Sequence, residues 1–133
     1  MGRVIVRDRT EDLQVELMAK KLSAKAQQKL DSLQEATRKL DRIHGMVEQY
    51  ASSKADYYAA MISRAGADLG RVFMNAGLGV MADHAKQMGV LAKRGGATAT
   101  KFRGLRELVG SLRGELDRAT KAVHEAERER PPE

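Results

Sequence analysis

The residues with the clearest chemical potential are basic side chains around a glycine-rich stretch in the second half of the chain. The stretch Gly95-Gly96-Ala97-Thr98-Ala99-Thr100 has the composition of a loop or hinge. Five cations flank it: Lys93, Arg94, Lys101, Arg103 and Arg106. The amides of a glycine loop next to cations can hold phosphate oxygens, and the cations also attract acidic protein surfaces. We predict that this basic hinge binds an acidic partner; the alternative is a hinge whose charges serve only to keep it hydrated.

The placement of charge points to the same region. The chain of 133 residues has a net charge of +6. Residues 86–113 contain seven basic side chains and one acidic side chain, so this window accounts for the whole excess. Such a positive field attracts nucleic acid, acidic lipid headgroups and acidic proteins alike. Phe102 is the one aromatic residue near the hinge that can stack on a base, which argues against sequence-specific recognition of single strands.

Three tyrosines form the second candidate site: Tyr50, Tyr57 and Tyr58. The seven-residue spacing of Tyr50 and Tyr57 places both on one face of a helix, where packing is the simplest explanation. Tyr58 falls beside that face. We predict that the three rings lie near a chain reversal and contribute to a partner-binding surface there, with packing inside a helix seam as the alternative.

No set of residues in the sequence matches a catalytic or cofactor-binding motif. The sequence contains no Gly-x-x-x-x-Gly-Lys phosphate loop, no Gly-x-Ser-x-Gly nucleophile elbow and no Glu-x-x-His pair of the kind that holds di-iron centres. His44 and Glu48 share a helix face and supply at most half a metal site, and His84 is expected to pack in a helix seam. The chain has no cysteine, which excludes disulfides and thiolate ligands. We therefore predict a protein that is not an enzyme, with no catalytic residue, no cofactor and no bound metal.

A long apolar stripe in the first half of the chain indicates the element that positions these residues. From Val15 to Met61 a residue suited to burial recurs about every 3.5 positions, which is the repeat of a coiled-coil seam. The stripe consists of Val15, Met18, Leu22, Ala26, Leu30, Leu33, Ala36, Leu40, Ile43, Val47, Tyr50, Lys54, Tyr57 and Met61. No proline interrupts it, and Lys54 is its one charged member. The stripe predicts a single helix over residues 10–64.

Glycines divide the second half of the chain into two further helices. Gly66 and Gly70 mark the predicted chain reversal, and a second helix is predicted over residues 67–93. Small residues recur through this helix, although glycine destabilises a helix interior by about 1 kcal/mol relative to alanine. Such a repeat predicts that another helix backbone approaches closely. After the hinge a third helix is predicted over residues 100–129, capped by one of the two hinge threonines.

The predicted helix lengths favour an all-α fold in which the chain folds back on itself, because the two later helices together match the first. We predict an elongated antiparallel helical hairpin, or coiled coil, with a broken returning arm, as a single domain over residues 10–129. Residues 1–9 are predicted to form a short extended arm and residues 130–133 a disordered tail. A two-helix seam leaves apolar surface exposed, so we predict a homo-oligomer, with a dimer favoured. A parallel coiled coil between chains through the first helix is the alternative.

Two parts of the sequence resemble known families. A long basic hairpin with tyrosines near its tip resembles the coiled-coil stalk proteins of flagellar and type III export ATPases. The resemblance rests on the helical periodicity and on the spacing of Tyr50 and Tyr57. The glycine-rich returning arm departs from that family. Val109-Gly110-Ser111-Leu112-Arg113 resembles the core of the peptides that direct cargo into encapsulin shells, which are usually flexible tails. Both resemblances imply docking to a larger assembly.

The apolar segments of the sequence are too short or too polar to direct the protein to a membrane or out of the cell. Val4-Ile5-Val6 is too short for the apolar core of a signal peptide, and residues 65–92, the least polar stretch, still contain five ionisable side chains, so no transmembrane segment is predicted. We predict a cytoplasmic, non-enzymatic helical adaptor or assembly component that acts by coiled-coil self-association and by docking a protein partner. A stalk-like protein of a secretion or export apparatus is one such component. The alternatives are a nucleic-acid-associated protein that uses the basic hinge on phosphates and, more remotely, the cargo of an encapsulin-type shell.

Overall fold

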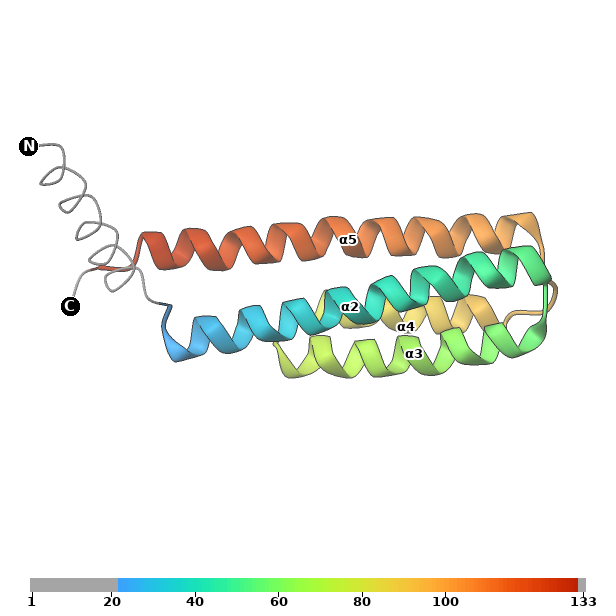
Figure 1. Ribbon diagram of the computed structural model, residues 1–133, viewed down its shortest axis with the longest axis horizontal. Coiled ribbons are helices and arrows are strands. Elements are labelled where there is room, and N and C mark those ends of the chain that lie inside the picture. The colour runs from blue at the N-terminus through green and yellow to red at the C-terminus, as the bar shows by residue number, and fades with distance from the viewer. Residues whose placement is uncertain (1–21, 132–133) are drawn as a thin grey trace, which may run out of the picture.

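The computed structural model describes residues 22–131, which form four helices and no strand. The helices are α2 (Ala24–Ser53), α3 (Asp56–Asn75), α4 (Gly79–Lys93) and α5 (Ala99–Arg128). Each helix runs antiparallel to the one before it, and each packs against two neighbours in the cyclic order α2, α3, α4, α5 (Figure 1). The described chain is therefore an up-down-up-down four-helix bundle.

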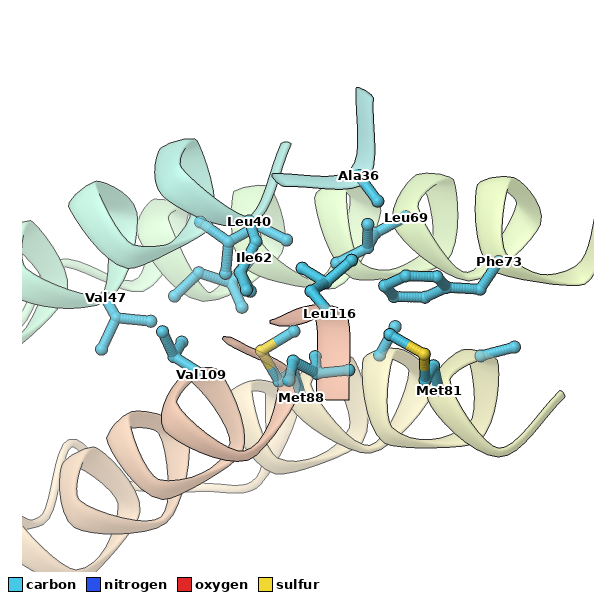
Figure 2. Close-up of a cluster of buried hydrophobic side chains, with 14 of the residues drawn as sticks. Ala36, Leu40, Val47, Ile62, Leu69, Phe73, Met81, Met88, Val109 and Leu116 are labelled. Carbon is cyan, nitrogen blue, oxygen red and sulfur yellow. The ribbon is translucent and has the colours of Figure 1, made fainter. Parts of the chain in front are cut away.

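An apolar stripe on each helix contributes to a core between the four helices. The stripe of α2 is the middle part of the predicted seam, whose residues from Ala26 to Tyr50 are all buried. Figure 2 shows core side chains from every helix: Ala36, Leu40, Val47, Ile62, Leu69, Phe73, Met81, Met88, Val109 and Leu116. Full burial of one large apolar side chain contributes about 1.5–3 kcal/mol, so this core is the main source of stability. Because the other helices cover the seam, the exposed surface from which we predicted a dimer is not found within residues 22–131, and the homo-oligomer stays a prediction.

The first predicted helix ends at Ser53, well before its predicted end. Lys54 caps α2 in the left-handed region with a φ of 59°, and its backbone N–H donates to the carbonyl of Tyr50 at 2.7 Å. The hydroxyl of Ser53 accepts the N–H of Ala55 at 3.2 Å. Helix α3 then begins with Asp56, whose carboxylate suits the positive end of a helix dipole. Local polar caps therefore reverse the chain earlier than the glycine pattern predicted.

The second predicted helix is also divided, in this case by a glycine. Helix α3 ends in a Schellman motif: the N–H of Leu78 donates to the carbonyl of Phe73 at 2.8 Å, and the N–H of Gly77 donates to that of Met74 at 3.0 Å. Gly77 has a φ of 76°, a left-handed conformation in which glycine has no steric penalty. The turn between α3 and α4 spans residues 76–78. The described chain therefore has one helix more than predicted.

Gly66 and Gly70, the predicted chain reversal, lie inside α3 where it packs against α4. A Cβ at Gly66 would lie 2.8 Å from the carbonyl oxygen of Ala85, and a Cβ at Gly89 would lie 3.3 Å from the Cα of Ser63. These glycines let two helix backbones come into contact. The prediction of a close backbone approach is confirmed, whereas the prediction of a break at Gly66 and Gly70 is wrong.

Helix α5 closely matches the third predicted helix, and Thr98 is its N-cap. The all-α class is confirmed for the described residues, but the elongated hairpin and the count of three helices are not. The predicted arm of residues 1–9, the first part of the predicted 10–64 helix and the end of the predicted tail lie outside the described residues. Among residues 22–131, no helix combines the length and the apolar character needed to cross a membrane.

The bundle has two unlike ends because its helices differ in length. Helices α2 and α5 have 30 residues each, α3 has 20 and α4 has 15. The α2–α3 and α4–α5 connections lie together at one end, which we name the two-loop end (residues 53–56 and 93–99; Figure 1). At the opposite end, which we name the open end, α2 and α5 extend past the α3–α4 turn (Figure 1).

Candidate functional site

The fold brings both predicted sites to the two-loop end. Tyr50 lies in the last turn of α2, and Tyr57 and Tyr58 lie in the first turn of α3. The basic residues lie where α4 ends and α5 begins: Lys93, Arg94, Lys101, Arg103 and Arg106. In the predicted hairpin the tyrosines and the basic hinge would lie at different heights along the rod. The chain reversal after Ser53 instead places them at the same end of the bundle (Figure 1).

Lys101 is not part of the surface at this end, because its side chain is buried and only 4% exposed. Its Nζ donates to the hydroxyl of Tyr50 at 3.2 Å, to the carbonyl of Ala92 at 3.0 Å and to the carbonyl of Arg94. An ammonium group has three N–H donors, so these three acceptors satisfy it. The two carbonyls lie at the C-terminal end of α4, where the helix dipole favours a cation. Lys101 therefore ties the end of α4 to α2.

Tyr50 is the second interior residue of the two-loop end. It is 1% exposed, and its ring packs edge-to-face on Phe102, with ring centroids 5.1 Å apart and an interplanar angle of 89°. Such a pair contributes about 0.5–1.5 kcal/mol beyond the burial of its area. Because its hydroxyl accepts the Lys101 hydrogen bond, the polar end of the ring is satisfied as well. Tyr50 and Lys101 therefore hold the two-loop end together from inside.

Arg106 is exposed, but its charge is already paired. Its Nε and Nη2 donate to the two carboxylate oxygens of Glu48 at 2.8 and 2.9 Å, which joins α5 to α2. The hydrogen bond from Arg106, helped by the positive charges of Arg106 and His44, lowers the pKa of Glu48 below its ordinary value and outweighs the opposing effect of burial. The same hydrogen bond raises the pKa of Arg106.

The edge between α2 and α5 holds a second ion pair. Nη1 of Arg113 lies 2.7 Å from Oδ1 of Asp41, and its Nη2 lies 3.3 Å from Nδ1 of His44. Of the seven cations in the basic window, Arg106 and Arg113 are thus held against acidic residues of α2, and Lys101 is buried. The exposed and unpaired positive charge of this region is therefore smaller than the sequence window indicates.

Three of the five cations that flank the hinge are exposed and unpaired in the described part of the chain. Lys93, Arg94 and Arg103 are exposed, and within the described residues none of them has an ion pair. Lys93 is the last residue of α4, and Arg94 caps it. The hinge then turns at Gly96, whose φ is 85°. We name Lys93, Arg94 and Arg103 the basic surface.

Tyr57 and Tyr58 form an aromatic pair at the same end. Their ring centroids are 4.2 Å apart and their planes are tilted by 31°. Tyr57 is 59% exposed, whereas Tyr58 is partly buried. Hydrogen bonding with Tyr58, followed by desolvation, raises the pKa of Tyr57 above 10.0, so its hydroxyl stays neutral at physiological pH. The pair presents a neutral aromatic face of the kind that is enriched at protein interfaces.

The histidines of the described chain do not form a metal site. Nδ1 of His84 lies 2.6 Å from Oε1 of Glu115, which links α4 to α5. Nε2 of His44 lies 3.8 Å from Oε2 of Glu48. Among residues 22–131, no group of three histidine or acidic side chains is placed to hold a metal ion.

The segment that resembles an encapsulin cargo peptide lies in the middle of α5. Its two large apolar residues, Val109 and Leu112, are buried in the bundle core. Arg113 is engaged by Asp41. In the folded bundle this segment is part of a helix that faces the core, whereas the cargo peptides that it resembles are usually flexible tails; the cargo alternative stays a prediction.

Comparison with known proteins adds no relative. No protein-family model, no curated protein and no solved structure matches the chain. The function must therefore be argued from the residues of this chain alone.

Proposed function

We propose that this protein is a non-enzymatic helical adaptor or assembly component that docks an acidic protein partner through the two-loop end. The observation that carries the proposal is the basic surface, whose three cations are exposed and have no ion pair among the described residues. Tyr57 and Tyr58 add an aromatic face at the same end. Tyrosine and arginine supply a large share of the binding energy at protein interfaces.

The interior of the two-loop end supports the proposal because it fixes the hinge. Lys101 binds the carbonyl of Arg94, and the hydroxyl of Thr98 accepts the N–H of Lys101 at 3.1 Å. Both contacts hold the hinge between the end of α4 and the start of α5. A loop that is ordered before binding loses less conformational entropy when a partner docks.

A protein partner is favoured over nucleic acid by the number of available cations. The affinity of a protein for nucleic acid rises with the number of phosphates that its cations neutralise, and the basic surface supplies three cations. Phe102 is 5% exposed and packs against Tyr50, so it cannot stack on a base. The nucleic-acid alternative therefore depends on charge alone.

The test is a capture experiment with the tagged full chain in extract of the native cell, with the bound proteins quantified by mass spectrometry. The variant Lys93→Gln/Arg94→Gln/Arg103→Gln removes the basic surface. The matched control removes three exposed cations that also have no ion pair among the described residues: Arg38→Gln/Arg42→Gln/Arg64→Gln. Because both variants have the same net charge, we expect the first to lose its partner and the control to keep it.

The outcomes separate the alternatives. Partner capture that survives in the first variant would refute the proposed surface, and equal loss in both variants would indicate long-range attraction without a defined site. Nucleic acid is tested separately with purified protein at about 50 mM salt, where phosphate contacts are strong. Binding there that falls steeply with added salt and equally in both variants would replace the proposal with the nucleic-acid alternative.

A further inference from the structure

A polar hollow of about 210 Å³ lies at the open end, between the start of α2 and the end of α3. The side chains that can donate an N–H or O–H group to a ligand in this hollow are Lys25, Gln28, Lys29, Ser32 and Asn75. Within residues 22–131 none of these side chains has a hydrogen bond or an ion pair, and no carboxylate lines the hollow. Lys29 and Ser32 are half-buried. These donors are therefore free to bind a negatively charged group.

The helix ends beside the polar hollow do not oppose an anion. Lys25 and Gln28 lie in the first turns of α2, and the N-terminal end of a helix is the positive end of its dipole. The last carbonyls of α3 would repel an anion if they were free. Three of them, those of residues 72–74, accept N–H groups of the turn that follows α3. The charge at this hollow is therefore set mainly by Lys25 and Lys29.

A second hollow, of about 340 Å³, adjoins the first and shares Lys25 and Lys29 with it. It lies where α2 and α5 extend past the α3–α4 turn (Figure 1). Its apolar lining consists of Ala26 of α2, Leu78 of the turn, and Ala119, Ala122, Val123 and Ala126 of α5. From Ala119 to Ala126, α5 rises by about 10 Å, which is close to the extended length of a decyl chain. We name the polar and the apolar hollow together the open-end pocket.

The acidic residue among the described lining of the apolar hollow does not neutralise the two lysines. The carboxylate of Glu127 accepts the backbone N–H of Ser23 at 2.8 Å and lies 3.2 Å from Nη1 of Arg130. Lys25 and Lys29 therefore keep their positive charge at the junction between the apolar and the polar hollow. An apolar surface with a few polar groups at one side is the usual composition of a small-molecule site.

We propose that the open-end pocket binds a single-chain lipid with an anionic headgroup. The alkyl chain lies along Ala119, Ala122 and Ala126, where its burial supplies affinity. The headgroup lies in the polar hollow, where charge-assisted hydrogen bonds from Lys25 and Lys29 select a phosphate or a carboxylate. The pocket lies at the opposite end of the bundle from the basic surface, so this proposal does not depend on the docking function of the two-loop end.

The test titrates the purified full chain with amphiphiles below the concentrations at which they form micelles, with binding measured by calorimetry and by NMR of the alanine methyl groups. The probes are decyl phosphate, decanoate, decyltrimethylammonium and inorganic phosphate. We expect saturable binding of one decyl phosphate or decanoate per chain, with shifts at Ala122 and Ala126. The cationic amphiphile lacks the ion pairs and inorganic phosphate lacks the chain, so both should bind at least about tenfold more weakly.

Two pairs of variants test the two halves of the pocket. Lys25→Gln/Lys29→Gln removes the cations, and Arg38→Gln/Arg42→Gln is the matched control, with the same change of charge at exposed positions of α2. We expect the first variant to bind decyl phosphate at least about tenfold more weakly and the control to bind it normally.

The apolar half is tested with a bulky side chain. Ala122→Trp fills the apolar hollow, and Ala60→Trp places the same side chain at an exposed position of α3 away from the pocket. Because both alanines are exposed, both variants should fold, which thermal unfolding checks. We expect Ala122→Trp to abolish saturable binding of both anionic amphiphiles and Ala60→Trp to preserve it.

The outcomes decide the proposal. Saturable binding that both pocket variants weaken and both controls keep would support it, and the tighter of decyl phosphate and decanoate would identify the headgroup. Absent binding, or equal binding of the cationic amphiphile, would overturn it, because the second result is that of a detergent adsorbed without a defined site. Binding to vesicles with anionic lipids but not to the free amphiphiles would also overturn it, since the protein would then contact a membrane surface and not enclose a single chain.

Discussion

The two ends of the bundle differ in how completely the described residues shield the core from solvent. At the two-loop end, Lys101 is buried with every N–H donor satisfied, and the Tyr50 ring is closed against Phe102. At the open end, the buried seam residues Ala26 and Leu30 keep 9% and 7% of their surface exposed, and Lys25 and Lys29 have no partner among the described residues. Buried polar and aromatic contacts therefore close one end, whereas the core of the other end keeps slightly more exposed surface.

The difference shows that stability is unevenly distributed along the bundle. Local opening is least favourable where buried contacts are dense and most favourable where helix ends are exposed. The two-loop end therefore suits a docking surface that must keep its shape.

The largest expected effect comes from the same substitution at the two ends. Leu105→Ala removes a fully buried side chain near the two-loop end, and Leu30→Ala removes one that is 7% exposed at the open end. Leu→Ala substitutions destabilise by about 2–5 kcal/mol, depending on how well the site can relax. We expect Leu105→Ala near the top of this range and Leu30→Ala near the bottom, as measured by urea unfolding at constant m-value. Equal losses would remove the contrast between the ends.

The second-largest loss of stability is expected when the buried ammonium group of Lys101 is removed. Lys101→Met keeps most of the side-chain volume but leaves the carbonyl of Ala92, the carbonyl of Arg94 and the hydroxyl of Tyr50 without their donor. Unsatisfied buried groups destabilise by about 1–3 kcal/mol, and we expect a loss of about 2–3 kcal/mol in thermal or chemical unfolding. Lys93→Met, at an exposed position on the same end, should change stability by less than about 0.5 kcal/mol. If the two variants unfold alike, Lys101 does not hold the hinge.

Removing the N-cap of a helix at each end should cause a smaller and more local loss of stability. Thr98→Ala removes the cap of α5 at the two-loop end, and Ser23→Ala removes the cap of α2 at the open end. A lost cap destabilises by about 1 kcal/mol. We expect Thr98→Ala to lower global stability by this amount, and Ser23→Ala mainly to speed hydrogen exchange in the first turn of α2. If hydrogen exchange in Ser23→Ala instead rises throughout the bundle, the first turn of α2 opens only when the whole bundle unfolds, and the two ends do not differ in local stability.

Acidic pH should have the smallest effect. The pKa of Glu48 is lowered by Arg106, and the pKa of Asp68 is lowered by the hydrogen bond from Lys39, whose Nζ lies 2.6 Å away. Carboxyl groups with a folded-state pKa below the unfolded values of 4.5 and 3.8 stabilise the fold above those values. This contribution is lost as the pH falls through the folded-state values. Because these carboxyl groups are substantially exposed, the loss of stability at acidic pH should be modest. In Arg106→Gln we expect the melting temperature to fall less steeply with decreasing pH than in the unmodified protein.

The elements that follow from local patterns were predictable from the sequence. The stripe from Ala26 to Tyr50 and the whole of α5 are visible because burial repeats at the helical period. The turn after Ser53 was missed because Lys54 adopts a left-handed conformation that glycine or asparagine more often signals. The polar residues Ser53 and Asp56 were the available signal. Gly66 and Gly77 are the same residue type, yet one permits a helix contact and the other ends a helix.

The sequence showed that basic residues cluster around the hinge, but it did not show which of them are buried or paired. Lys101 looks like its neighbours in the sequence, and its burial depends on carbonyls that α4 supplies once the bundle has formed. Arg106 pairs with Glu48, which lies 58 residues away, and no local pattern indicates that this pairing neutralises one of the hinge cations. Exposure and pairing are tertiary properties. The basic surface could therefore be delimited only after the fold was known.

The close contact between Gly66 and Ala85 has a consequence for how the chain folds. Helices α3 and α4 are joined by a three-residue turn and meet at their backbones, so their contacts are short in sequence and close early at little entropic cost. The contact between α2 and α5 joins the most distant parts of the described chain and needs the other helices in place. We expect the α3–α4 pair to form the folding nucleus, with Gly66→Ala slowing folding more than it speeds unfolding. The α3–α4 pair would then set the rate at which α2 and α5 close on it.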